Sequence, residues 1–294
     1  MKPGRTGPFP YLPINRRPRL SWPNDKQLAL WVIPNIEFFP LDEPIGGVTG
    51  GSDGKVPDVR HWAGRDYGNR VGVFRLMDVL HKHGIRATVA LNSDICDDRP
   101  QIIEDAVKLD WELMGHNQTN SRRLNNVPAE EEHAVIRATL ERIEKACGKR
   151  PLGWLSSGLQ ETWNSLDYLA QEGVCYIADW VNDDQPYVMK LAERTILSVP
   201  YSTEINDKPA FEEHHFTADE FGQMICKQFD VLYHEGAQSG RVMAIALHPY
   251  LTGQAHRIGA LDSALKHICG HEGVWRATGS EIARHYLSQA TGNI

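Results

Sequence analysis

The chain has 294 residues, of which 41% are hydrophobic and 23% are charged, and its formal net charge is −7. A chain of this length buries enough surface to fold without disulfides or a structural metal. The acidic balance, together with a basic cluster that spans only residues 16–19, argues against a nucleic-acid or anionic-membrane surface. We therefore expect neither a nucleic-acid partner nor a membrane partner.

The amino-terminal residues 1–24 contain six prolines and are rich in Arg and Gly. Proline excludes regular helix, so this segment is predicted to be an extended arm. Residues 25–294 show no linker and no internal repeat, and they are predicted to form one domain. An extended arm can wrap a neighbouring subunit, so we expect a homo-oligomer.

Apolar runs alternate with amphipathic stretches from residue 27 onward. The run at 28–34 (LALWVIP) is continuously apolar, as expected of a buried parallel strand. Further strands are predicted at 86–91, 110–114, 153–155, 174–178 and 241–247. Helices are predicted at 70–83, 99–108, 128–147, 166–172, 217–235, 260–269 and 279–288. Gly84, Gly148 and Gly173 follow three of these helices and are predicted to end them.

The stretch at 43–67 is Gly-rich and has no periodicity, so it is predicted to be a long functional or mobile loop. The repeated strand–helix units imply a parallel α/β architecture, which can be either a barrel or a doubly wound sheet. The five cysteines form no Cys-x-x-Cys pair, and the chain has neither a signal-peptide core nor a run of membrane-spanning length. These features predict a cytoplasmic protein with reduced thiols.

Polar residues follow six of the predicted strands at the point where each strand ends. They are Asn35 and Glu37; Asn92 and Asp94; His116 and Asn117; Ser156 and Ser157; Asp179 and Trp180; and His248 with Tyr250. Each alone is more often a helix cap or a turn residue. Because the carboxyl ends of parallel strands share one rim, repetition at six ends favours a functional site there.

The chemistry available at this rim is two carboxylates and two imidazoles: Glu37, Asp179, His116 and His248. Such a set suits polarising a carbonyl group and moving protons during hydrolysis. The sequence has no G-x-S-x-G elbow, no cysteine with a local partner, no Walker loop and no G-x-G-x-x-G after a strand. The pattern therefore favours a hydrolase in which water attacks directly.

Five phrases of the chain resemble the polysaccharide deacetylase (NodB-homology) family. They are RDYGNRVGVFRLMDVLHKHGIRAT (65–88), WELMGHNQTN (111–120), GWLSSGLQET (153–162), YIADWVNDDQPY (176–187) and LHPYLTGQAHRIGALDSAL (247–265). The nearer likeness is to the branch that includes an allantoinase and cyclic-imide hydrolases. This resemblance implies a deformed (β/α) barrel of about seven parallel strands.

The resemblance also assigns expected roles. Deacetylases of this family hold a divalent metal with an Asp and an H-x-x-x-H pair. Here Glu37 falls near that Asp, His116 matches the first His, and Asn120 stands where the second His belongs. If a metal such as Zn²⁺ is bound, the resemblance implies these three residues as its ligands. His248 matches the general-acid His, whereas Leu155 replaces an Arg and Asn35 stands where the base Asp is expected.

The allantoinase-like branch implies a second version without metal. In this version Glu37 is the general base, with a pKa raised by burial, and His116 and His248 supply the acid and the oxyanion partner. The further residues expected to bind substrate are Asn35, Asn120, Trp180 and Tyr250. Trp180 and the stretch at 43–67 are expected to cover the pocket.

The expected function is hydrolysis of a non-peptide carbon–nitrogen bond in a small amide, ureide or cyclic imide. Two alternatives remain open: a metal-dependent sugar N-deacetylase, and a non-catalytic barrel that binds a carbohydrate or another ligand. Asn35 and Asn120, which replace charged residues, are the best evidence for the non-catalytic barrel. Retention of three titratable groups (His116, Asp179 and His248) favours an enzyme.

Overall fold

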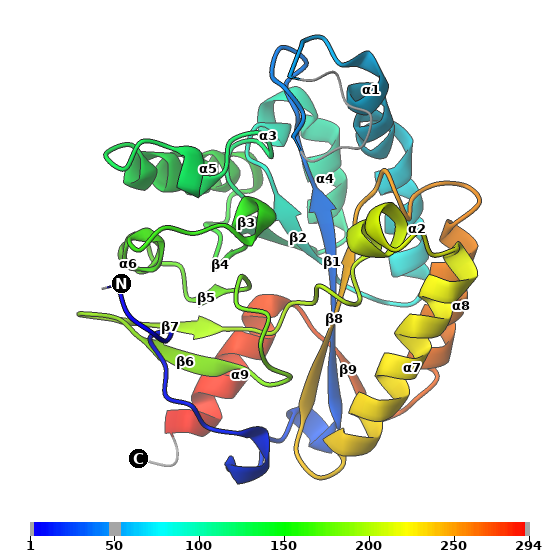
Figure 1. Ribbon diagram of the computed structural model, residues 1–294. Helices are drawn as coiled ribbons and strands as arrows, with labels where there is room; N and C mark the ends of the chain where they lie inside the picture. The colour runs from blue at the N-terminus through cyan, green and yellow to red at the C-terminus, as the bar shows by residue number, and fades with distance from the viewer. Residues whose placement is uncertain (1–2, 47–53, 292–294) are drawn as a thin grey trace.

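The computed structural model describes residues 3–46 and 54–291, which form one strongly curled sheet surrounded by helices (Figure 1). The described sheet has nine strands in the order β6-β7-β5-β4-β3-β2-β1-β8, with β9 paired to β1. The strands are β1(Leu28–Ile36), β2(Thr88–Leu91), β3(Glu112–Gly115), β4(Gly153–Trp154), β5(Tyr176–Ile177), β6(Tyr187–Lys190), β7(Thr195–Ser198), β8(Arg241–Leu247) and β9(Val274–Arg276). All pairs are parallel except β6 with β7.

The two ends of the sheet approach each other without forming a regular ladder. Val242 of β8 donates its N–H to the carbonyl oxygen of Asp184, and Ala246 donates to that of Ile205, both at 2.9 Å. These bonds close the sheet through loop segments rather than through a strand pair. The predicted deformed parallel barrel is confirmed.

Nine α-helices are found among the described residues, and all seven predicted helices are present. They are α1(Val59–Tyr67), α2(Val73–Lys82), α3(Ile95–Asp98), α4(Pro100–Lys108), α5(Glu132–Cys147), α6(Ser165–Gln171), α7(Ala218–Gly236), α8(Ile258–Cys269) and α9(Gly279–Thr291). Gly84, Gly148 and Gly173 have φ angles of 62°, 73° and 87°, so they end the preceding helices as predicted. No helix in the described ranges is both long and apolar enough to cross a membrane.

Some elements differ from the prediction. Residues 47–53 of the expected loop at 43–67 lie outside the described residues, but residues 59–67 form α1, so the prediction of loop there is wrong. Asp58 caps this helix by accepting a hydrogen bond from the N–H of His61, and a π-helical turn (Gly68–Gly72) joins it to α2. The short strands β6, β7 and β9 were not predicted from the sequence.

Alternation along β1 determines which residues reach the site. Its even-numbered residues pack against the surrounding helices, whereas Ala29, Trp31 and Ile33 point into the barrel. Glu37 continues the inward series just beyond the strand. On β8 the inward residues are Val242, Ala244 and Ala246, and His248 continues that series. The strand period therefore brings Glu37 and His248 to the same end of the barrel interior.

The amino-terminal arm packs on its own barrel. Lys190 of β6 donates its N–H to the carbonyl oxygen of Pro8 at 2.7 Å, and Arg17 makes a two-pronged ion pair with Asp183. Trp22 is 2% exposed and donates its indole N–H to a backbone carbonyl of β8. The division at residue 24 and the homo-oligomer both stay predictions.

Gly72 brings the π-helical turn against the loop that follows β8. A Cβ atom at this position would lie 2.0 Å from the carbonyl oxygen of Pro249. We expect Gly72→Ala to lower the free energy of unfolding by about 1–3 kcal/mol, because the backbone of that loop would have to move. Urea denaturation of the purified variant measures this change.

Gly64→Ala is the matched control, because Gly64 lies in α1 and a Cβ there would contact nothing within 4 Å. Restricting the unfolded chain should raise the free energy of unfolding by about 0.4–1 kcal/mol in this variant. Equal effects of the two substitutions would show that the close approach at Gly72 does not limit stability.

Candidate active site

Three of the four predicted catalytic residues meet at the carboxyl ends of β1, β3 and β8. The Oε1 atom of Glu37 lies 3.6 Å from Nε2 of His248 and 3.9 Å from Nε2 of His116. The three side chains are only 4–8% exposed. The barrel therefore assembles one carboxylate and two imidazoles in a nearly closed space.

Asp207, which was not predicted from the sequence, bonds Nδ1 of His248, whereas Nε2 faces Glu37. Nδ1 of His248 lies 2.7 Å from Oδ1 of Asp207, and the backbone N–H of His248 donates to Oδ2 at 2.8 Å. Burial alone would lower the pKa of His248, but the charges of Asp207 and Glu37 and their hydrogen bonds raise it to about 9. His248 is therefore positively charged at neutral pH.

Glu37 is the negative partner of this pair. Burial alone would raise its pKa, but the positive charge and the polar contact of His248 hold it well below its ordinary value. The amide of Asn120 also donates to Oε1 at 2.8 Å. The expectation that burial raises the pKa of Glu37 is wrong, because an opposite charge nearby outweighs the loss of solvent.

His116 is oriented by the backbone. Its Nδ1 lies 2.6 Å from the carbonyl oxygen of Leu155, and a carbonyl oxygen can only accept a hydrogen bond. Nδ1 therefore carries a proton. In the neutral ring this leaves Nε2 as an acceptor that faces Glu37.

Asp179, the fourth predicted catalytic residue, lies next to the cluster of Glu37, His116 and His248 and is not part of it. Its Oδ1 accepts a hydrogen bond from the N–H of Ser156 at 2.6 Å. Its carboxyl group also lies within hydrogen-bonding reach of Glu161. Burial and the charge of Asp179 raise the pKa of Glu161 well above its ordinary value.

The four predicted substrate-binding residues fall into two groups. Asn35 lies inside the barrel, where its amide donates to the carbonyl oxygens of Ile33 and Leu247 and accepts from the hydroxyl of Tyr201, each at 3.3 Å. These bonds occupy Asn35 with the barrel itself. Asn120 lies beside Glu37, and its Oδ1 is buried without a partner among the described residues.

Trp180 and Tyr250 lie at the rim. The indole N–H of Trp180 donates to Glu161 at 3.0 Å, and its ring meets Phe9 of the arm edge-on, with centroids 5.4 Å apart. The ring of Tyr250 lies 5.8 Å from that of His248. Tyr250 therefore lies beside His248, whereas Trp180 lies beside Asp179 and Glu161.

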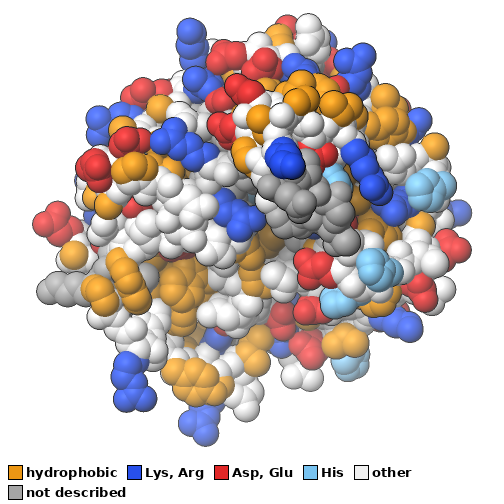
Figure 2. All heavy atoms as spheres, turned by 45° about the horizontal axis from the view of Figure 1, so that its top comes forward, with side chains coloured by type: hydrophobic (Ala, Val, Ile, Leu, Met, Phe, Trp, Pro, Cys, Tyr) orange, Lys and Arg blue, Asp and Glu red, His pale blue; other side chains and the backbone are white. Residues whose placement is uncertain are grey.

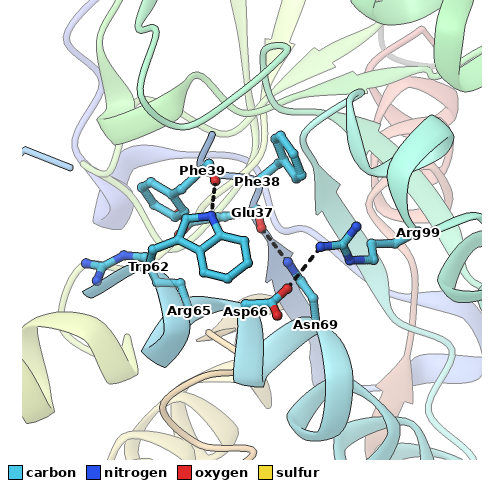
Figure 3. Close-up of a pocket in the computed structure, with 8 residues that line it drawn as sticks. All are labelled: Glu37, Phe38, Phe39, Trp62, Arg65, Asp66, Asn69 and Arg99. Carbon is cyan, nitrogen blue, oxygen red and sulfur yellow. Dashed lines mark hydrogen bonds and ion pairs between the residues drawn. The ribbon is translucent and has the colours of Figure 1, made fainter. Parts of the chain in front are cut away.

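A small cavity borders Glu37, and Figure 3 shows the side chains that line it. The guanidinium of Arg65 lies over the rings of Phe39 and Tyr250, at 4.9 and 5.0 Å. Arg65 is 9% exposed, and its Nε is buried with no partner in the described part of the chain. An N–H group in this position suits a carbonyl or carboxylate oxygen.

The rim around the site carries no surface of a single charge. Figure 2 views this end of the barrel and shows Lys and Arg side chains interspersed with Asp and Glu. A nucleic-acid surface would show a dominant basic patch here.

The predicted metal ligands Glu37, His116 and Asn120 offer one carboxylate and one imidazole. Asn120 turns its NH₂ group toward Glu37, and an amide nitrogen that donates a hydrogen bond is not a ligand. Within residues 3–46 and 54–291, no three His, Cys, Asp or Glu side chains are grouped as a metal site requires. This donor set does not fit a tight metal site, which needs three good ligands, and the mechanism below uses none.

Several known proteins are similar to this chain in sequence and fold. Residues 65–177 match the polysaccharide deacetylase family. A Schizosaccharomyces pombe protein named as a polysaccharide deacetylase is 29% identical over 250 residues, which cover 76% of this chain and 75% of that protein. The crystal structure of a probable polysaccharide deacetylase from Pseudomonas aeruginosa PAO1 has 25% identity and a TM-score of 0.86, and covers 94% of this chain and 96% of that one.

The crystal structure of Puue allantoinase has the same fold, with a TM-score of 0.85 and 24% identity over 92% of this chain and 94% of that one. The predicted fold is therefore confirmed by two independent neighbours. The match over residues 65–177 and these similarities confirm the predicted resemblance to the polysaccharide deacetylase family.

Proposed function

We propose that this protein hydrolyses a non-peptide carbon–nitrogen bond of a small molecule, using a water molecule held between Glu37, His116 and His248. The observation that carries this proposal is the buried pair of Glu37 and His248, whose Oε1 and Nε2 atoms lie 3.6 Å apart and which Asp207 holds in place. The family and the names of the similar proteins, deacetylase and allantoinase, support a reaction at an amide-type bond.

The chemistry follows from the protonation states. Glu37 takes a proton from the water as its oxygen attacks the carbonyl carbon, and the acceptor Nε2 of His116 orients the same water. The imidazolium of His248 stabilises the negative oxygen of the tetrahedral intermediate. Glu37 then gives this proton to the leaving nitrogen as the carbon–nitrogen bond breaks, which restores its ionised carboxylate. Because Nε2 of His116 orients the water, only His248 stabilises the oxyanion.

The nearly closed site favours a small substrate with both N–H and C=O groups. Nε of Arg65 is a buried donor without a partner, and Oδ1 of Asn120 is a buried acceptor without one. A ureide or cyclic imide offers the complementary groups side by side, and unpaired buried groups would reject a substrate that lacks them. Trp180 and Tyr250 would contact the rest of the molecule at the rim. A cytoplasmic location also stays a prediction.

The test is hydrolysis of allantoin, hydantoin and succinimide by the purified protein, before and after treatment with EDTA. We expect ring opening of at least one compound and no loss of rate after chelation. Loss on chelation with recovery on adding Zn²⁺ would contradict the metal-independent mechanism. Release of acetate from N-acetylglucosamine oligomers, without cleavage of the three small compounds, would favour the sugar N-deacetylase that the relatives' names suggest.

A further inference from the structure

Asp179 and His116 lie on opposite sides of one peptide group, the group that joins Leu155 to Ser156. Its C=O accepts the Nδ1 proton of His116 at 2.6 Å, and its N–H donates to Oδ1 of Asp179, also at 2.6 Å. This peptide bond is trans, so its C=O and N–H point in opposite directions. The carboxylate and the imidazole are therefore connected through a single planar group.

The position of this peptide follows from the end of the sheet. Leu155 donates its N–H to the carbonyl oxygen of Gly115, and Ala178 donates to that of Trp154, so the chain here still runs between β3 and β5. If the parallel ladder continued, the C=O of Leu155 would accept from the N–H of Asn117, and the N–H of Ser156 would donate to the C=O of Ala178. The side chains of His116 and Asp179 take those two places instead.

A peptide that is hydrogen-bonded at both ends is polarised. A carboxylate on the N–H favours the resonance form with negative charge on the carbonyl oxygen, which makes that oxygen a better acceptor. The negative charge of Asp179 is thereby felt by the Nδ1 proton of His116. The arrangement strengthens the bond that fixes which ring nitrogen of His116 carries the proton.

We propose that Asp179 is a positioning residue that acts through the Leu155–Ser156 peptide to hold His116 with its proton on Nδ1 and its Nε2 free as an acceptor. The sequence pattern marked Asp179 as catalytic, but its carboxylate reaches the reaction only through His116. The catalytic consequence rests on the proposed function, because it is the water between Glu37 and His116 that the free Nε2 would orient. The orientation of His116 does not depend on it.

Glu161 faces the second carboxyl oxygen of Asp179, Oδ2, which is not bonded to Ser156. Oε2 of Glu161 and Oδ2 of Asp179 are both buried, and neither has another partner among the described residues. The two carboxyl groups are within hydrogen-bonding reach, so one proton between them satisfies both oxygens. Asp179 thus keeps its Oδ1 on the N–H of Ser156. Glu161 itself is fixed by the indole N–H of Trp180.

The test is the protonation pattern of His116, measured at pH 7 by long-range ¹H–¹⁵N correlation on the ¹⁵N-labelled full-length protein. The His116→Gln variant identifies the signals of His116. We expect the wild type to show a proton on Nδ1. In Asp179→Asn, which keeps an acceptor oxygen but loses the charge, the Nδ1 proton signal should move upfield. In Asp179→Ala, which removes the acceptor as well as the charge, this upfield shift should be larger.

Glu161→Gln is the matched control, because its amide can donate to Oδ2 of Asp179 and leaves the charge of Asp179 in place. Its His116 signals should equal those of the wild type. Finding the proton of His116 on Nε2 in the wild type would overturn the proposal without any variant. Folded Asp179 variants, judged by circular dichroism, with unchanged His116 signals would overturn it as well.

Kinetics on a substrate of the proposed reaction add a second measure. We expect Asp179→Asn to lower kcat about tenfold with KM within about twofold of wild type, because partners of a functional His typically contribute 10–100-fold. Glu235→Gln, which makes the same chemical change at the opposite end of β8, should stay close to the wild type. The spectra need no substrate, so they test the role of Asp179 even if the proposed function is wrong. Unchanged spectra would contradict the role of Asp179 without contradicting the proposed function.

Discussion

Glu37→Gln is expected to lower kcat by roughly 10²–10⁴-fold, the range attributed to a general base. Gln has nearly the same shape and can still accept the hydrogen bond from Asn120. It cannot take a proton from water, so the loss should fall on kcat more than on KM. Steady-state kinetics on a compound that the wild type hydrolyses provide the measurement.

Glu235→Gln makes the same chemical change far from the reaction. Glu235 pairs with Arg241 at the opposite end of β8, and its side chain is 44% exposed. This variant should retain wild-type kcat within about twofold, as surface substitutions usually do little. A folded Glu37→Gln enzyme as fast as this control would remove Glu37 from the mechanism.

Asp207→Asn is expected to lower kcat about 10–100-fold and to change the pH dependence. In the wild type the pKa of His248 is raised to about 9, so activity that needs the imidazolium should persist through neutral pH and fall above about pH 9. Without the charge of Asp207 the pKa of His248 falls, and activity should decline at a lower pH. Rates measured from pH 6 to pH 10.5 show the pH at which activity declines in both proteins.

The structure of the variant needs its own measurement. Asp207 is fully buried and accepts hydrogen bonds from His248 and Thr252, so circular dichroism should accompany the kinetics. The decline in wild-type activity above about pH 9 is an independent check, since measuring it requires no substitution. A rate that rises steadily from pH 8 to pH 10 would show that a neutral His248, not the imidazolium, supports the reaction.

The strand ends could be predicted because they depend on local pattern. The run at 28–34 is apolar throughout, and the inward series Trp31, Ile33 leads to Glu37 by the two-residue period of a strand. The same period leads along β8 to His248. Once the strands are parallel and in one sheet, these residues have to meet at its carboxyl edge. The repetition of polar residues at the strand ends is therefore the signal that located this cluster, and the alternation seen in the structure explains why the side chains meet.

Asp207 and Glu161 could not be predicted in this way. Glu161 lies outside the strands and helices, and Asp207 lies in a short helical turn that leads into the π-helical turn Pro209–Glu213. Neither segment is long enough to show a periodicity that indicates which way a side chain points. Their roles come from contacts with residues distant in the chain, His248 and Asp179. The lowered pKa of Glu37 was missed for a similar reason: burial can be guessed from an apolar run, but the distance to an opposite charge cannot.

The missed elements have a different cause. Helix α1 exposes most of its surface and contains few apolar residues, so it lacks the stripe from which helices are predicted. Strands β6, β7 and β9 have only three or four residues, too few to show alternation. Tertiary pairing determines such short elements, and that pairing is not visible in a local window.

The amino-terminal arm has a consequence for how copies of the protein meet. Strand β6 is the last strand of the sheet order, and its far side would otherwise offer backbone N–H and C=O groups to any passing strand (Figure 1). The arm covers part of that side through the bond between Lys190 and Pro8, with Phe9 packed 4.7 Å from the ring of Tyr187. Because a proline has no N–H, this cover cannot itself serve as a template for a further strand. The arm thus protects the barrel from growing into an intermolecular sheet.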